Sequence, residues 1–273
     1  MLFLKLPPAA ALRSLVMGYW FIEDLPGAYE GQPIHTTPHP GAVLTINFGR
    51  PCTADFAAGA PRASLLGVQS RSRTWHSGPD CYFVMVMLRP TGLARLFPSS
   101  GAALGDDMLE LGAFLGDGVT RRLSDALYEA WAPRDIAGRL DAWLLRRVEE
   151  TRPPSEIARF SRAWDTLRHT GRVEAAAEAA GVSMRQLERW FQAHVGHGPK
   201  RLLGLDRVHA SLQSAQTGQG DPLEGFSDQS HQIRSWRRHL GMTPGQYARA
   251  SSSILAGYFN PRRATAEGLA HFL

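Results

Sequence analysis

Hydrophobic and polar positions change their period near residue 109, and this change divides the chain. Before that point short runs alternate or are apolar throughout, as in strands; after it apolar residues recur every three or four positions, as in amphipathic helices. The run at 81–88, CYFVMVML, is apolar at every position and predicts a central strand buried on both faces. The other predicted strands lie at 19–22, 41–48, 65–68 and 71–76.

Several short strands at this spacing indicate a sandwich or small barrel, and a barrel of eight strands has room for one small ligand. We therefore expect residues 1–108 to form a β-barrel or cupin-like sensing domain. Three histidines fall here, His35, His39 and His76. Cupins bind metals through His and Glu, but this spacing is not their usual one and the pattern places no third ligand. We expect polar loop residues and no metal site.

Two amphipathic stripes occupy residues 109–152, which we interpret as linker or dimerisation helices. Leu123, Leu127 and Trp131 are spaced by four, and Pro133 separates them from a second stripe at 136–148. Helices of this kind can pack on the preceding domain or pair with their copies in another subunit, and the sequence leaves both alternatives open. Paired prolines at 153–154 mark the next boundary.

The stretch 172–195 predicts two short helices joined by a tight turn. Gly181 ends the first helix, and Ser183 can cap the second, with Gln186 completing a capping box. The first helix has a narrow apolar stripe of Val173, Ala176, Ala177 and Ala180, and the second a wide one of Leu187, Trp190, Phe191 and Val195. Arg185, Glu188, Arg189 and Gln192 occupy the opposite face of the second helix.

This is the plan of a helix-turn-helix, in which the second helix enters the major groove of DNA. The alternative is an ordinary αα-hairpin of a helical domain. Flanking stripes predict further helices at 155–170 and 200–216, the latter with Leu205, Val208 and His209 on its inner side.

A second unit follows at 225–250. Ser227 can cap a helix whose inner side carries Ile233 and Trp236. Thr243 can cap another, because Pro244 stands at the first helical position and Gln246 three residues after the cap.

The motif GFSDQSH at 225–231, followed by RRHLGMTP at 237–244, resembles the C-terminal signature of AraC/XylS-type transcription regulators. The stretch SMRQLERWFQAHVGHGPKRLL at 183–203 is similar to the first recognition element of the same family. The resemblance covers roughly 155–250 and implies a DNA-binding domain at 153–250 with two helix-turn-helix units. The motifs YWFIED, GAVLTINFG and LRPTGLARLF are similar, more loosely, to β-rich domains attached to some members.

The resemblance implies contact with double-stranded DNA through both units. In the first unit, contact falls on the outward residues Arg185, Glu188, Arg189 and Gln192. In the second unit, Gln229, Ser230 and Arg234 are expected at base edges, and Arg237 and Arg238 at phosphates. For each arginine the alternative is a solvated surface charge.

Two departures from the family pattern concern the second unit. Only residues 217–224 precede GFSDQSH, where members usually have a full helix, so most of that helix is predicted to be missing. Gln232 stands where a large apolar residue is usual, and the helical pattern points it at the core. We therefore hypothesise that the second unit is truncated and degenerate and that the first carries most of the specificity.

Charge supports a nucleic-acid partner for the helical part. The net charge is +5 over 273 residues, and residues 155–250 hold 13 Lys and Arg against 9 Asp and Glu, whereas 1–154 hold 15 against 15. Twelve of the thirteen are arginine, which suits phosphate and guanine edges. A solvated basic face is the alternative.

The cysteines, Cys52 and Cys81, are expected in the core of a protein in a reducing compartment. No apolar run approaches the ~20 residues of a membrane span, so a cytoplasmic protein without membrane contact is expected. A phosphate loop, a nucleophile elbow and a paired-carboxylate motif are all missing from the sequence, which argues against an enzyme or a cofactor.

The sequence thus predicts an α+β protein that regulates transcription as a cytoplasmic homodimer, with a possible small-molecule effector in the N-terminal domain. One alternative is a regulator with degenerate DNA binding that acts through protein contacts. Another is a cupin-like metal enzyme fused to a helical domain. The tail, 251–273, is apolar enough to predict docking on the rest of the chain.

Overall fold

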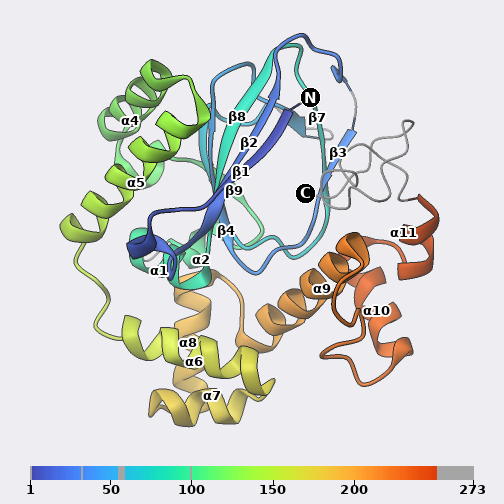
Figure 1. Cartoon of the computed structure of the whole chain (residues 1–273). Helices are drawn as coiled ribbons and strands as arrows, with labels where there is room; N and C mark the ends of the chain where they lie inside the picture. Colours follow the sequence, from blue (N-terminus) through green and yellow to red (C-terminus); the bar gives the residue numbers. More distant parts are fainter. Residues whose placement is uncertain (1, 32, 55–58, 99, 251–273) are drawn as a thin grey trace.

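The computed structural model describes residues 2–31, 33–54, 59–98 and 100–250. Antiparallel sheets occupy the N-terminal part and helices the C-terminal part (Figure 1), so the predicted α+β class is confirmed. The predicted tail lies outside the described residues. Within them, none of the helices combines the length and the apolar character that crossing a bilayer requires.

The N-terminal part contains a six-stranded and a three-stranded antiparallel sheet. The larger has the order β1 (Leu2–Leu6), β2 (Val16–Asp24), β8 (Cys81–Leu88), β4 (Ala42–Asn47), β6 (Ala63–Leu66) and β9 (Met108–Glu110). The smaller has the order β3 (Pro33–Thr36), β7 (Arg73–His76) and β5 (Thr53–Ala54). All five predicted strands are found, with shifted ends for most of them; β1, β3, β5 and β9 were not predicted.

Strand β8 is buried at all eight positions between β2 and β4, which confirms the predicted central strand. Alternate residues serve two different cores, because side chains of a strand point to opposite faces. Val84 and Val86 belong to the main core beneath the helices, whereas Met85 and Met87 belong to a second cluster with Trp75 of the smaller sheet. The smaller sheet therefore packs against the face of the larger sheet that carries Met85 and Met87. Cys52 and Cys81 are buried and unbridged, as predicted for core cysteines.

The helices α4 (Asp117–Ala130) and α5 (Pro133–Glu150) pack on the larger sheet of their own chain. The Asp141 carboxylate of α5 accepts hydrogen bonds from the Tyr19 hydroxyl (2.6 Å) and the Ala9 amide (2.9 Å). Packing on the chain's own sheet, one of the two alternatives for these helices, is therefore present, and pairing with a second subunit stays a prediction. Trp131 departs from the predicted stripe, because α4 ends before it in a backbone turn with φ of +51° and the side chain is 48% exposed.

The C-terminal part begins with the predicted hairpin of α7 (Val173–Ala180) and α8 (Met184–Val195). Gly181 has φ of +62°, the left-handed conformation in which glycine carries no steric penalty, and Ser183 caps α8. The other helices are η1 (Ala10–Leu12), α1 (Pro90–Leu96), α2 (Gly101–Leu104), α3 (Gly112–Leu115), α6 (Ile157–Thr170), α9 (Pro199–Thr217), α10 (Gln229–Leu240) and α11 (Pro244–Ala250).

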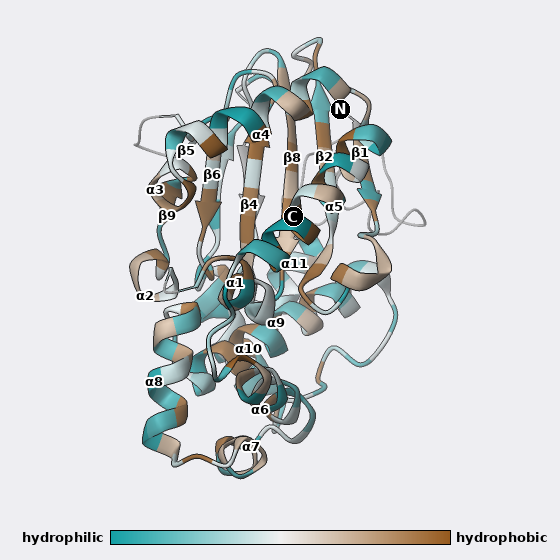
Figure 2. Cartoon of the chain, turned by 90° about the vertical axis from the view of Figure 1, so that its left-hand side faces the viewer, coloured by the Kyte–Doolittle hydropathy of each residue, from teal (hydrophilic) through white to brown (hydrophobic). Residues whose placement is uncertain are grey.

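The end of α8 rests on α2, and Figure 2 shows α8 running away from this contact and from the sheet. The approach is close because Gly101 has no side chain: a Cβ there would lie 2.2 Å from the carbonyl carbon of His194 and 2.4 Å from the Val195 nitrogen. The backbone of α2 therefore fixes where the C-terminal end of α8 lies relative to the sheet.

We predict that Gly101→Ala lowers the free energy of unfolding by about 1–3 kcal/mol, because backbone atoms of α8 must move to admit the methyl group. Denaturant titration at pH 7 measures the change.

Gly138→Ala is the matched control. Gly138 lies on the exposed side of α5 with no atom within 4 Å of its Cβ position, so alanine there should stabilise the helix by up to about 1 kcal/mol. Equal effects of the two substitutions would show that the close contact at Gly101 is not a constraint.

Candidate nucleic-acid interface and ligand cavity

Helix α8 has one buried and one exposed face, as the sequence predicts. Its buried side chains pack on α6, α7 and α9, and include Leu187, Trp190 and Phe191. The four predicted contact residues, Arg185, Glu188, Arg189 and Gln192, are all exposed on the other face. Met184, 54% exposed at the start of the helix, is an apolar side chain on the surface that the sequence did not single out.

Hydrogen bonds on α8 hold two of the four exposed side chains. The Ser183 hydroxyl accepts from the Gln186 amide (3.2 Å), which confirms the cap. The Gln186 side chain accepts from the Arg189 guanidinium (2.7 Å) instead of completing the predicted capping box. The Gln192 amide donates to the Gly196 carbonyl (3.0 Å) at the other end. The Arg189 and Gln192 side chains are therefore oriented along the helix surface.

The second unit differs from the prediction at its cap. Helix α10 begins at Gln229, so the residue at the cap position is Asp228, whose carboxylate accepts from the His231 amide (2.7 Å). The prediction that Ser227 is the cap was wrong by one residue, and the Ser227 hydroxyl instead donates to Asp228 (3.1 Å). The predicted box at Thr243 is formed in both directions with Gln246, at 3.1 Å and 2.8 Å.

Gln232 is buried, as its position in the helical pattern predicts. Its amide donates to the Ser211 hydroxyl (3.1 Å) and to the Pro222 carbonyl (2.7 Å), so the polar group is satisfied. The Trp236 ring also donates to Ser211 (3.0 Å). Between α9 and α10 the chain runs through turns from Gly218 to Asp228 without a helix. That this unit is a truncated form of the family's second unit stays a prediction.

A groove of about 770 Å³ lies between α9, α10 and the chain that follows β6. Of the predicted contact residues, Arg234 and Arg238 line it. Gln229, Ser230 and Arg237 are exposed on α10 but do not line it. Its cationic side chains are Arg71, Lys200, Arg201, Arg207, Arg234 and Arg238, and in the part of the chain that the structure describes no carboxylate lines it.

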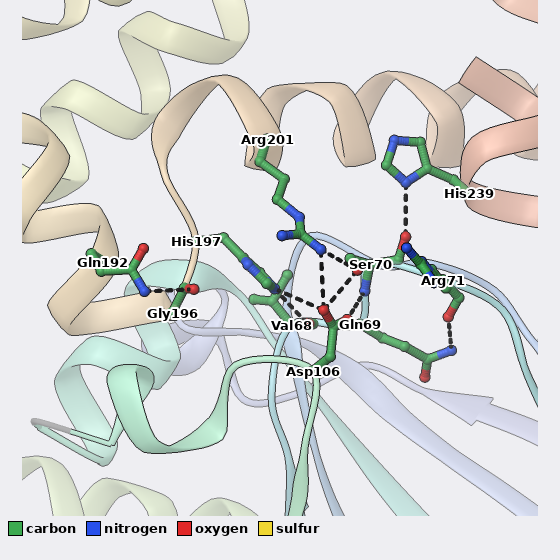
Figure 3. Close-up of polar contacts among 10 residues, drawn as sticks. All are labelled: Val68, Gln69, Ser70, Arg71, Asp106, Gln192, Gly196, His197, Arg201 and His239. Carbon is green, nitrogen blue, oxygen red and sulfur yellow. Dashed lines mark hydrogen bonds and ion pairs between the residues drawn. The ribbon is translucent and has the colours of Figure 1, made fainter. Parts of the chain in front are cut away.

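One wall of the groove joins the sheet to the helices through charged and polar contacts (Figure 3). The Arg201 guanidinium of α9 donates to the Ser70 hydroxyl (2.6 Å) and to the Asp106 carboxylate (3.2 Å). His239 of α10 donates to the Ser70 carbonyl (2.7 Å), and His197 donates to the carbonyl of Val68 (3.0 Å). We call Val68–Ser72 the junction segment.

Asp106 is the anion at this contact. Burial raises the pKa of its carboxyl. Hydrogen bonds from Ser70 and the nearby His197 and Arg201 lower the pKa by more than burial raises it, so the net pKa lies below the usual 3.8. The carboxylate is thus stabilised in its charged form. No periodic pattern in the sequence points to Ser70, Asp106 or His239, because their partners lie far away in the chain.

The histidines considered as metal ligands have other surroundings. The His39 ring accepts from the Gly41 amide (2.9 Å), and its backbone forms a bridge to Gln69. His76 lies in β7. Within the described ranges no three His, Cys, Asp or Glu side chains lie close enough together to hold a metal ion.

A cavity of about 90 Å³ lies between the two sheets. Its walls are mostly apolar and include Trp20 and Trp75, with a few polar groups such as Thr36 and Gln69. One wall residue, His209, comes from α9 in the helical part. The sequence placed His209 on the inner side of that helix, but not in a cavity.

We predict that Asp106→Asn lowers the midpoint of denaturation at pH 7. A carboxyl whose folded pKa is depressed contributes stability above its unfolded pKa and loses it as the pH falls through the folded value. The difference between wild type and variant should therefore shrink below about pH 4.

Asp107→Asn is the control, since Asp107 is exposed and its carboxylate lies outside the contact. Denaturant titrations at pH 7 and pH 3 compare the three proteins. A difference for Asp106→Asn that persists undiminished at pH 3 would contradict the electrostatic explanation.

Comparison with known proteins gives two family matches and several similar structures. Residues 4–110 match a model described as a domain of unknown function (DUF6597), and residues 176–250 match a helix-turn-helix domain. No curated protein matches the chain.

The similar structures include several of ToxT from Vibrio cholerae. One, from O395, is 10% identical with a TM-score of 0.45, and the match covers 84% of this chain and 97% of that chain. Another, of wild-type ToxT from strain SCE256 with bound unsaturated fatty acid, is 10% identical with a TM-score of 0.40, covering 84% and 90%. The family match at residues 176–250 confirms the resemblance seen in the sequence: this part of the chain is a helix-turn-helix domain of the AraC type.

Proposed function

We propose that this protein is a transcription regulator that binds specific sequences of double-stranded DNA. The exposed face of α8 carries the proposal, because Arg185, Glu188 and Arg189 stand together on a helix whose opposite face is buried. Arginine can donate to O6 and N7 of guanine, and glutamate can accept from N4 of cytosine. Gln192 extends the same face by one turn.

The groove beside α10 supports phosphate binding next to the base contacts. Its cations come from α9, from α10 and, through Arg71, from the junction segment between β6 and β7. Asp106 pairs with Arg201, but no carboxylate among the described residues lines the groove beside the other five cations, so a polyanion would relieve their mutual repulsion. We assign base contacts in this unit to Gln229, Ser230 and Arg234, and phosphate contacts to Arg237 and Arg238.

The cavity between the sheets supports response to a small effector. We propose that residues 1–108 sense it, that 109–152 join subunits into a homodimer, and that 153–250 bind DNA. An effector changes DNA binding only if it prefers one arrangement of these parts. Sedimentation equilibrium tests the dimer, and a monomer at micromolar concentration would contradict it.

Two alternative functions predict different results. A regulator that acts through protein contacts alone should show no preference among DNA sequences. A cupin-like enzyme should copurify with stoichiometric metal. A sequence preference together with a steep fall of affinity with salt would favour the proposal over both.

We predict that Arg189→Ala weakens binding to a selected DNA site by about 1–3 kcal/mol and that Arg234→Ala has a smaller effect. The first unit is expected to carry most of the specificity. Selection from a random DNA pool supplies the site, and fluorescence anisotropy at fixed salt measures the affinity.

Arg146→Ala is the control, because Arg146 is exposed on α5, away from both units. A larger loss for Arg234→Ala than for Arg189→Ala would refute the hypothesis of a degenerate second unit.

We further predict that Arg71→Gln weakens binding to all DNA sequences alike. The loss of one phosphate contact should reduce the slope of log affinity against log salt by about 1. Arg13→Gln, on an exposed residue outside the groove, should leave the slope unchanged. An unchanged slope for Arg71→Gln would show that the junction segment does not contact DNA.

A further inference from the structure

The cavity between the sheets is completed by the DNA-binding part of the chain. His209 lies on α9, which connects the first helix-turn-helix unit to the second. Its ring stands edge-on to the His39 ring, with centroids 4.8 Å apart and planes at 86°. Both rings line the cavity. A molecule in the cavity would therefore touch a helix that positions both recognition helices.

Two polar atoms of the cavity wall have no hydrogen-bond partner. They are Nδ1 of His209 and the hydroxyl oxygen of Ser64 in β6, and neither atom is accessible to solvent. Buried polar atoms are nearly always paired, so an unpaired one needs an explanation. Other polar groups of the wall are paired: the Gln69 amide donates to the Thr36 hydroxyl (3.0 Å), and the Asn47 amide donates to the Pro61 carbonyl (3.0 Å). Both atoms belong to residues that line the cavity, but neither touches its free space as the side chains stand, so a ligand would supply the missing bond to His209 once the ring turns Nδ1 toward the cavity.

The rest of the wall is apolar and soft. Strand β8 contributes Phe83, Met85 and Met87, and two tryptophans, Trp20 and Trp75, complete the aromatic part. Aromatic and methionine side chains adapt to an apolar body of varied shape. The wall thus fits a mostly apolar molecule with one polar group.

Charge restricts the ligand further. The cavity wall contains no Asp, Glu, Lys or Arg among the described residues. Burial lowers the pKa of His39 to about 3 and that of His209 to about 4, so both rings are neutral at pH 7. Lys5 lies outside the wall, with its amino group 4.2 Å from the centre of the Trp20 ring. An ionised ligand would lose its hydration without gaining a countercharge in the wall.

The volume limits the size of the ligand. One water needs roughly 10–15 Å³ of cavity measured in this way, so about 90 Å³ holds on the order of six to nine waters. A ligand with a similar number of non-hydrogen atoms fits without expansion of the sheets.

We infer that the cavity binds a small, uncharged, mostly apolar molecule whose hydroxyl or similar group forms a hydrogen bond with Nδ1 of His209. The inference rests on the proposed function only for its consequence. Because the ligand would be held by the sheets and by α9 together, its binding free energy would depend on how α9 sits, and DNA affinity would change with it.

Three matched probes test the ligand class in the full chain: benzyl alcohol, toluene and benzoate. All three contain one benzene ring. Benzyl alcohol carries a hydroxyl, toluene carries no polar group, and benzoate carries a negative charge. Affinities come from NMR titration at pH 7.5, and the ring nitrogens of ¹⁵N-labelled histidine report contact with His209. Benzyl alcohol should bind at least tenfold more tightly than benzoate and should shift Nδ1 of His209. Benzoate binding as tightly as the alcohol, or an unchanged His209 signal at saturation, would overturn the inference.

His209→Leu should remove the preference for benzyl alcohol over toluene while leaving toluene binding within about threefold. His169→Leu, on an exposed histidine of α6, is the control and should keep the preference. The wild-type nitrogen shift decides the question even if His209→Leu fails to fold. A preference retained by a folded His209→Leu protein would contradict the assigned hydrogen bond.

Measuring DNA affinity with and without the probe tests this inference separately from the proposed function. Saturating benzyl alcohol should change the DNA affinity of the wild type at least threefold. If the alcohol shifts His209 but DNA affinity stays constant, the coupling is wrong and the ligand class stands. If no DNA sequence is preferred at all, the proposed function fails, and the probe titrations still decide the cavity.

Discussion

The junction segment, Val68–Ser72, is the constraint on which the arrangement of the two parts depends. Gln69 lines the cavity between the sheets, whereas Ser70 and Arg71 line the basic groove. Two hydrogen bonds tie the segment to His239 of α10, since the Ser72 amide donates to the His239 carbonyl (3.0 Å) and the His239 ring donates to the Ser70 carbonyl. A displacement of this segment would therefore change the shape of the cavity and of the groove together.

The sheet and the helices are joined by one packing contact and by one polar network. The contact of α8 with α2 is a close backbone approach, which gives packing energy with little directional preference. The contact around Asp106 is a network of hydrogen bonds and charges, which is stable only when every member is paired. The bonds of this network have preferred directions, so it restrains how α9 lies against the junction segment.

The two helix-turn-helix units rest on different cores. The small residues of α7 let α8 pack closely, and both belong to the core that continues into the sheet. Helix α10 rests on a small separate cluster around Trp236, where the polar Gln232 stands in place of an apolar side chain. A recognition helix that packs on the larger core is held more rigidly. This supports the proposal that the first unit carries most of the DNA specificity.

The sequence by itself determined the strands with clear alternation, the caps at Gly181 and Ser183, and the exposed face of α8. These follow from periodicity and from hydrogen bonds within four residues, which are local properties. The cap at Asp228 is also local, because its partner is the His231 amide, although the sequence analysis placed it one residue earlier. Tertiary structure decided the end of α4 before Trp131, the groove and the cavity wall at His209. Bonds such as that between Ser70 and His239 join residues 169 positions apart. Only the docking of sheet and helices brings such residues together, and no local pattern encodes it.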